Sequence, residues 1–266
     1  MNQTVKYIIS SLRGYIADDE LCATALFVAE ETTKLSRTEV LCKDTLNIDN
    51  LETIISRLRR HEPVQYIFSH TEWHGLNLKV TPATLIPRPE TAELVDWVNA
   101  ENFDKCRVLD IGTGSGCIAI AVKKAHPNWQ VAACDISAEA LQVAQTNAQM
   151  NTAEINFFQC DILNNEIDDY DIIVSNPPYI ADNQQNIVDK NVLMYEPHSA
   201  LFVPQTDPLL FYRRMASIKK SRQLFFEINP FFAREMYDML CTYGYSQINI
   251  RNDIEGKQRF IRATWL

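Results

Sequence analysis

Apolar residues in the first part of the chain recur at the spacing of amphipathic helices. They return every three or four positions in residues 5–12 and again in residues 21–29, which is typical of helices with one buried face. The segment Ser36–Glu39 has the spacing of a capping box and predicts a further helix start. Pro63 stops helix formation. The pattern predicts a small helical domain over residues 1–62.

The next segment changes to an alternation of apolar and polar positions. Residues 65–80 alternate, are rich in aromatic side chains and contain Gly75 as a turn residue, which predicts a β-hairpin. The prolines at positions 82, 87 and 89 predict an extended connector. Residues 63–88 are therefore expected to link two domains.

Beyond this linker, strand and helix patterns alternate. Such alternation predicts right-handed βαβ units and a parallel sheet, so residues 89–266 should form a doubly wound α/β domain. The last two strands are joined by a short turn at Gly256 and should form an antiparallel hairpin at or near one edge. The expected strands are residues 107–111, 130–134, 156–159, 171–175, 223–228, 247–251 and 259–264, and the expected helices are residues 91–100, 116–125, 138–150, 209–218 and 231–243.

Composition narrows the class of protein. With 46% hydrophobic and 22% charged residues among 266, the chain has the composition of a folded globular protein, which excludes disorder. No apolar run approaches the ~18 residues of a membrane helix, and the N-terminus lacks a signal-peptide core. The net charge of −9 argues against a protein that binds nucleic acid through contacts to its phosphates. These features predict a cytoplasmic protein without membrane or direct nucleic-acid partners.

Cysteine and histidine usage predicts neither disulfides nor a metal site. The seven cysteines are odd in number and contain no C-x-x-C pair, so buried, reduced thiols are expected. His70 and His74 have no obvious third ligand nearby in sequence, so a packing or surface role is expected for both.

A glycine cluster follows the first strand of the expected sheet. Gly112, Gly114 and Gly116 are three of only seven glycines, and they lie where a strand turns into a helix. Glycines there permit a tight turn and let a ligand approach the backbone. The dinucleotide fingerprint needs a further glycine at position 117, which is a cysteine. Asp110 before the loop disfavours a phosphate and favours a cationic ligand such as the amino group of S-adenosylmethionine.

Two further acidic residues end the next two strands. Asp135 is placed to accept hydrogen bonds from ribose hydroxyls, as a carboxylate does at this point of doubly wound folds. Asp161 is a candidate for contact with an adenine amine, with Ile162 packing on the ring. The alternative is that each aspartate only caps the following helix, a role that Ser137 also fits. Their position at consecutive strand ends beside the glycine loop favours a cofactor site.

The fourth strand ends at Ser175 and is followed by Asn176-Pro177-Pro178-Tyr179. The prolines fix the backbone and remove two N–H donors, which leaves a stiff turn with carbonyl acceptors. The Asn176 side-chain oxygen and the Pro177 carbonyl can each accept one hydrogen of a planar NH₂ group, and Tyr179 can stack on that group. A plain turn is the alternative.

These motifs together resemble a known family. An Asp-x-Gly-x-Gly-x-Gly loop followed by Asn-Pro-Pro-Tyr is similar to class I, Rossmann-like S-adenosylmethionine-dependent N-methyltransferases. Residues 85–91 (LIPRPET), 65–67 (QYI) and 196–201 (EPHSAL) resemble the HemK/PrmC-type release factor glutamine methyltransferases from about residue 60 onward. The resemblance departs at Ala92, His198, Pro208 and Asn229, which concerns local loop shape. The implied cofactor contacts are Gly112, Thr113, Gly114, Ser115, Gly116, Asp135, Asp161, Ile162 and Asn176, and the implied substrate contacts are Asn176, Pro177, Pro178, Tyr179, Arg88 and Glu90.

The resemblance also implies the reaction. It implies methyl transfer from S-adenosylmethionine to the side-chain amide nitrogen of the glutamine in the Gly-Gly-Gln loop of class 1 peptide chain release factors, with Asn176, Pro177 and Tyr179 as the catalytic turn. The helical domain is expected to recognise the protein substrate. A nucleic-acid base N-methyltransferase acting on adenine N6 or guanine N2 is the first alternative, because it uses the same turn. A nucleotide-binding oxidoreductase or a non-catalytic cofactor-binding module is the second.

Overall fold

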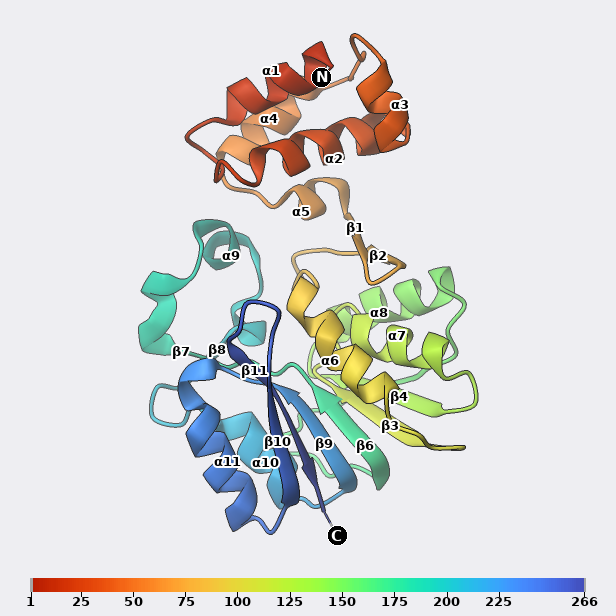
Figure 1. Cartoon of the computed structure of the whole chain (residues 1–266), viewed down its shortest axis with the longest axis vertical. Helices are drawn as coiled ribbons and strands as arrows, with labels where there is room; N and C mark the ends of the chain where they lie inside the picture. Colours follow the sequence, from red (N-terminus) through yellow and green to blue (C-terminus); the bar gives the residue numbers. More distant parts are fainter. Residues whose placement is uncertain (1, 266) are drawn as a thin grey trace. The chain divides into compact units, whose positions relative to one another are not determined.

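The computed structural model describes residues 2–265 (Figure 1). The chain forms two compact units. One comprises the chain up to His70 together with Val188–Tyr195, and the other comprises Thr71–Ile187 and the chain from Glu196 onward. The segment Val188–Tyr195 belongs to the first unit, although the sequence predicts it in the second domain. Its residues contact the N-terminal helices, which are far away in the sequence.

The first unit is helical, as the apolar spacing predicts. Its core is formed by fully buried side chains such as Val5, Ile8 and Leu58. The capping box is confirmed: the Ser36 amide donates to Glu39 Oε2 at 2.8 Å, and the Glu39 amide donates to Ser36 Oγ at 3.4 Å. The helices are α1 (Gln3–Leu12), α2 (Leu21–Thr33), α3 (Arg37–Cys42), α4 (Leu51–Arg59), α5 (Val64–Phe68) and α9 (Lys190–Tyr195).

The predicted hairpin is shorter than expected. Its strands are β1 (His70–Trp73) and β2 (Leu76–Lys79), while residues 65–68 lie in α5, so the prediction of strand there is wrong. Val64, Ile67 and Phe68 pack against the helical core at the i, i+3, i+4 spacing of a helical turn. The aromatic alternation of this segment also fits a strand, which explains the error.

The second unit is built on a seven-stranded sheet of order β10-β11-β9-β6-β3-β4-β5. Strands β9, β6, β3, β4 and β5 are parallel, and β11 and β10 form the predicted antiparallel hairpin at one edge. The doubly wound α/β prediction is therefore confirmed. The strands are β3 (Arg107–Ile111), β4 (Gln130–Asp135), β5 (Asn156–Gln159), β6 (Tyr170–Ser175), β9 (Ser221–Glu227), β10 (Ser246–Asn252) and β11 (Gln258–Thr264).

Helices cover both faces of this sheet (Figure 1). Alternate strand residues point to opposite faces, so Val108 packs with the first group of helices while Leu109 packs with the second. The first group is α6 (Pro89–Asn99), α7 (Cys117–Ala125) and α8 (Ala138–Met150), and the second is α10 (Leu210–Ser217) and α11 (Ala233–Thr242). The sheet thus lies between two helical layers, with its strand ends free to carry a site.

Several short elements were not predicted. They lie between β6 and α10 or just after β9, and each is too short to leave a periodic pattern. They are β7 (Ile180–Ala181), η1 (Asp182–Ile187), α9 (Lys190–Tyr195), η2 (His198–Ala200), β8 (Phe202–Val203) and η3 (Pro230–Phe232).

Two expectations from composition can be compared with the structure. All seven cysteines are free, but Cys22, Cys42 and Cys241 are exposed, so the expectation of buried thiols holds for only four of them. The exposed three lie on or beside amphipathic helices, where an apolar neighbourhood in sequence does not imply burial. No helix within residues 2–265 is long and apolar enough to cross a membrane.

Candidate active site

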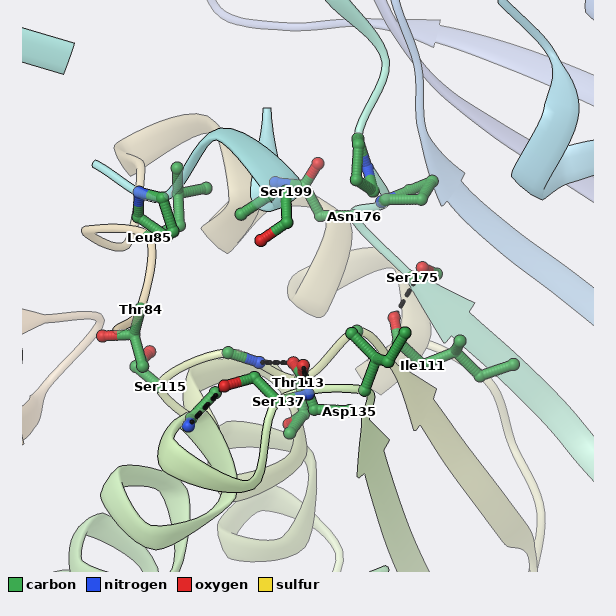
Figure 2. A pocket seen from close by; sticks show the side chains of 18 of the residues that line it. Thr84, Leu85, Ile111, Thr113, Ser115, Asp135, Ser137, Ser175, Asn176 and Ser199 are labelled. Atoms are coloured by element: carbon green, nitrogen blue, oxygen red, sulfur yellow. Dashed lines mark hydrogen bonds between the residues drawn. The ribbon is translucent and has the colours of Figure 1, made fainter. Parts of the chain in front are cut away.

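The carboxyl ends of β6, β3, β4 and β5 meet around one cavity of about 270 Å³. Parallel strands end at the same edge of a sheet, so the loops that follow them converge there. Figure 2 shows Thr113, Ser115 and Asp135 on one side of this cavity, with Asn176 and Ser199 across from them. The loop after each of the four strands contributes at least one lining residue.

The glycine loop is held in a tight turn over the end of β3. The amides of Gly112 and Thr113 both donate to the Cys134 carbonyl, at 2.9 and 3.0 Å. Gly116 adopts φ +83°, and a Cβ there would lie 3.1 Å from the Cβ of Ala144 on α8. Glycine is therefore required at this position both by backbone conformation and by the approach of α7 to α8.

Asp110 precedes the glycine loop near the end of β3. It is fully buried beneath the loop, is not among the residues that line the cavity, and accepts a hydrogen bond from Thr113 Oγ at 2.6 Å. Burial raises the pKa of Asp110 to about 7, an effect that the Thr113 hydrogen bond opposes. The strand direction turns this side chain into the core and away from the cavity.

Asp135 lines the cavity at the end of β4 and also organises the glycine loop. Its Oδ2 accepts from the Gly114 amide and its Oδ1 accepts from the Ser137 amide, both at 2.9 Å (Figure 2). The helix cap of α8 is Ser137, whose Oγ accepts from the Ala140 amide at 3.1 Å. Each carboxylate oxygen has two lone pairs, so Asp135 retains acceptor capacity toward the cavity.

Asp161 and Ile162 line the cavity after β5. Asp161 also shapes its own turn, because Oδ1 accepts from the Leu163 amide at 3.0 Å and Oδ2 accepts from the Asn164 side chain at 2.6 Å. Cys160 lies beside them in the cavity wall, and burial raises the pKa of its thiol. The thiol is therefore protonated near neutral pH, which argues against a nucleophilic role.

The turn after β6 brings Asn176, Pro177 and Pro178 to the cavity. Ser175 anchors the turn to the neighbouring strand, since its Oγ donates to the Ile111 carbonyl at 2.6 Å (Figure 2). Asn176 Nδ2 donates to Thr91 Oγ at 3.3 Å, so the side-chain amide has a fixed partner.

Arg88 lines the cavity but its guanidinium is paired. Nη2 donates to Glu196 Oε1 at 2.7 Å, and Glu196 Oε2 accepts from the Ile86 amide at 3.2 Å. The Glu196 side chain is only 1% exposed, so this ion pair ties the proline-rich connector to the segment at 196–201. Two stretches that carry the family resemblance are thus joined at the cavity.

Three predicted site residues lie outside the cavity lining. Gly116 is the N-cap of α7, Glu90 lies in the first turn of α6, and Tyr179 packs, partly buried, against the core on one face of the sheet. The Tyr179 hydroxyl donates to Glu227 Oε1 at 3.2 Å, and burial raises its pKa well above the usual range. This hydrogen bond ties the end of the turn to β9, while the Tyr179 side chain stays partly exposed.

Sequence reasoning missed other residues of the site. Asn147 on α8 is fully buried and donates to the carbonyls of Ser115 and Lys79 at 2.8 and 2.9 Å, which fastens the glycine loop to β2. Nothing in the local pattern of α8 marks this asparagine, although a polar residue on a buried helix face is the available signal. Several residues that line the cavity were also not predicted. They include Thr84, Leu85, Thr91, Ile136, Cys160, Ser199, Phe211 and Met215. Within residues 2–265 no cluster of three or more His, Cys, Asp or Glu side chains could hold a metal ion.

Solved structures of similar fold are methyltransferases. The catalytic domain of human Mettl16, in complex with the MAT2A 3′UTR hairpin 6, matches 72% of this chain and 75% of its own with a TM-score of 0.56 and 17% identity. The Mtq2–Trm112 complex of E. cuniculi, described as responsible for methylation of the eRF1 termination factor, matches 69% and 99% with a TM-score of 0.50 and 20% identity. The chain has the fold of class I methyltransferases.

Sequence comparison defines the family. The methyltransferase small domain model matches residues 90–201. The release factor glutamine methyltransferase of Flavobacterium psychrophilum is 38% identical over 97% of this chain and 96% of its own. That of Bacteroides thetaiotaomicron is 40% identical over 99% of both chains. The chain belongs to the release factor glutamine methyltransferase family.

Proposed function

We propose that this protein transfers a methyl group from S-adenosylmethionine to the side-chain amide nitrogen of glutamine in the Gly-Gly-Gln motif of class 1 peptide chain release factors. Two relatives that match nearly the whole chain are named for this modification. The observation that carries the proposal is that Asn176 and Pro177 line the same cavity as the glycine loop and Asp135. The reaction would take place in the cytoplasm, where peptide release occurs.

The cavity residues fit S-adenosylmethionine. A Cβ built on Gly112 or Gly114 has no atom within 4 Å, so a ligand can approach the loop backbone closely. Asp135 retains lone pairs for ribose hydroxyls, and Ile136 and Ile162 offer apolar surface for a purine. These features support assignment of the cofactor to this cavity.

The chain has to orient a weak nucleophile. When bound, S-adenosylmethionine supplies a methyl group on a positively charged sulfonium. An amide nitrogen is a poor nucleophile because its lone pair is delocalised into the carbonyl. The Asn176 side-chain oxygen and the Pro177 carbonyl can each accept one amide hydrogen and so hold the nitrogen in place. Orientation can supply several kcal/mol, below a ceiling of about 7–11 kcal/mol.

The same two acceptors stabilise the transition state. Positive charge develops on the nitrogen during transfer, and preorganised oxygen atoms stabilise such charge in a site that excludes water. No base is required before transfer, because the methylated amide cation is strongly acidic and loses its proton afterwards. No histidine lines the cavity within the described residues, which agrees with this mechanism.

Transfer of labelled methyl groups tests the proposal. The purified protein is incubated with methyl-labelled S-adenosylmethionine and, separately, with intact release factor, with release factor whose motif glutamine is replaced by alanine, and with bulk RNA and DNA. We expect label only on the unmodified release factor, with one added methyl on the Gly-Gly-Gln peptide. Label on nucleic acid alone would identify a base methyltransferase, and no label on any acceptor would indicate a cofactor-binding module.

A further inference from the structure

A chain of buried hydrogen bonds runs behind the Asn-Pro-Pro-Tyr turn. Asn176 Nδ2 donates to Thr91 Oγ at 3.3 Å, and Thr91 Oγ donates to Glu227 Oε2 at 2.7 Å. The Tyr179 hydroxyl donates to the other oxygen of Glu227 at 3.2 Å. Thr91 is 3% exposed and Glu227 is 2% exposed. One carboxylate on β9 therefore connects to both ends of the turn on β6.

Glu227 is an unusual residue to bury. A carboxylate in the core pays a large desolvation penalty unless it is well hydrogen-bonded. Burial raises its pKa, while the hydrogen bond from Thr91 and the positive charge of Arg259 oppose that change. The backbone pairing of β9 with β6 and β11 does not need this side chain, so its burial calls for another reason.

The hydrogen bonds have a direction that depends on Glu227. Glu227 Oε2 accepts from the Thr91 hydroxyl, so the single hydroxyl hydrogen of Thr91 is committed to Glu227. Thr91 Oγ can then only accept from Asn176, which forces the NH₂ end of that side chain toward Thr91. The two ends of a carboxamide are nearly equal in shape, so the hydrogen bonds decide its orientation. The acceptor oxygen of Asn176 is consequently turned away from Thr91.

We propose that Thr91 and Glu227 are positioning residues for methyl transfer, which act by fixing the orientation of the Asn176 side-chain amide. Without the carboxylate, the Thr91 hydroxyl is free to donate to Asn176 Oδ1. The NH₂ group of Asn176 would then take the place of the acceptor oxygen and face the NH₂ of the substrate amide. Two donors cannot form a hydrogen bond with each other. This proposal rests on the proposed function, because it assigns these residues to the same substrate amide.

Single-turnover methylation of release factor by Thr91 variants tests the proposal. Thr91→Val keeps the shape but removes the hydroxyl, and Thr91→Ser keeps the hydroxyl. We expect Thr91→Val to slow the transfer step by about fivefold or more, with KM for release factor changed by less than about twofold, as for loss of one buried hydrogen bond. Thr91→Ser should recover most of the lost rate. Thr264→Val is the matched control. Thr264 lies on β11, and its buried hydroxyl has no hydrogen-bond partner.

Combination with Asn176→Ala distinguishes positioning from general damage. If Thr91 acts through Asn176, Thr91→Val should add less than about twofold to the loss already caused by Asn176→Ala. Glu227→Gln keeps the size of the side chain but adds an NH₂ donor to it. We expect this variant to lose transfer rate as Thr91→Val does, and it provides the test if Thr91→Val does not fold. Cofactor affinity measured by calorimetry should stay near that of the wild type in the single variants of Thr91 and Glu227.

Three outcomes would overturn the proposal. A Thr91→Val protein with wild-type transfer rate would show that the hydroxyl does not position Asn176. Fully multiplicative losses in the double variant would show that Thr91 acts independently. Equal losses in Thr91→Val and Thr91→Ser would point to packing. A wild-type protein that methylates no release factor would instead refute the proposed function and the positioning role with it.

Discussion

Asp135 holds the glycine loop and lines the cavity at the same time. Replacement by alanine removes the acceptors for Gly114 and Ser137 together with those expected for ribose hydroxyls. Charged acceptors contribute roughly 1.5–3 kcal/mol per hydrogen bond, so we expect Asp135→Ala to weaken S-adenosylmethionine binding by about tenfold or more. Asp135→Asn keeps one acceptor oxygen and should lose less. Calorimetry on the folded variants measures this, and unchanged affinity in Asp135→Ala would refute the ribose assignment.

Asp110 should make stability depend on pH. Its pKa in the folded protein is about 7, against 3.8 for an unperturbed aspartate, so the folded state binds more protons than the unfolded state between these values. The free energy of unfolding should therefore fall as pH rises from about 4 to 7, by at most about 1.4 kcal/mol per unit, and change no further from this group above that range. Below about pH 4 both states are protonated and the contribution is fully present.

Asp110→Asn isolates this effect, because asparagine does not titrate. The free energy of unfolding of the variant minus that of the wild type should increase between about pH 4 and 7 and level off above. Urea unfolding at a series of pH values measures the difference. A difference that stays constant across this range would show that the buried carboxyl does not take up a proton on folding.

The sequence identified most residues of the site but not their orientation. Asp135, Asp161 and Asn176 were predicted at strand ends and line the cavity. Tyr179 was predicted there too, yet it packs partly buried against the core and its hydroxyl donates to Glu227. Asp110, which precedes the loop, is fully buried and accepts from Thr113. Motif position indicates that a residue is near the cavity, whereas the direction of its side chain depends on strand twist and on partners far away in the sequence.

At the scale of elements, the junction between the glycine loop and α7 is sensitive to added volume. Gly116 and Gly256 have nearly the same φ, +83° and +84°, but a Cβ would meet Ala144 at 3.1 Å in the first case and nothing within 4 Å in the second. Both alanine variants should carry the left-handed backbone cost of about 1–2 kcal/mol. Gly116→Ala should lose more stability because α7 and α8 must also move apart. Urea unfolding of the two variants gives the comparison, and equal losses would contradict the close approach of these helices.

Element type was predictable where a pattern repeats for two turns or several residues. The alternating strands and helices after residue 89 were predicted in the correct order, and α6 begins at Pro89 because proline is favoured in the first turn of a helix. The helix α5 was mistaken for strand, since five residues can satisfy both periods. Strands β7 and β8, of two residues each, exist through pairing with one another and have no local signal.

At the scale of the molecule, the helical unit is a candidate for recognition of the protein substrate. Deletion of residues 1–60 should leave cofactor affinity close to that of the wild type but raise KM for intact release factor sharply. The deletion also removes the packing partners of Val188–Tyr195, which belongs to the same unit, and the hydrogen bond from the Tyr195 hydroxyl to the Arg60 carbonyl at 3.0 Å. Activity on a short Gly-Gly-Gln peptide is therefore the control. Equal loss on peptide and on intact factor would show that the deletion damages the catalytic unit itself.

The account of the whole reaction depends on Asn176, and single-turnover methylation of release factor by its variants tests it most directly. Asn176→Ala removes one acceptor of the substrate amide and leaves one N–H of the bound amide without a partner, at a cost of about 1–3 kcal/mol. The loss should fall on the transfer step more than on binding, because the hydrogen bond strengthens as the nitrogen gains charge. We predict a rate at least about tenfold lower for Asn176→Ala, an intermediate rate for Asn176→Asp, and far smaller changes in cofactor affinity. A wild-type rate in Asn176→Ala would contradict this account and show that Asn176 only shapes the turn.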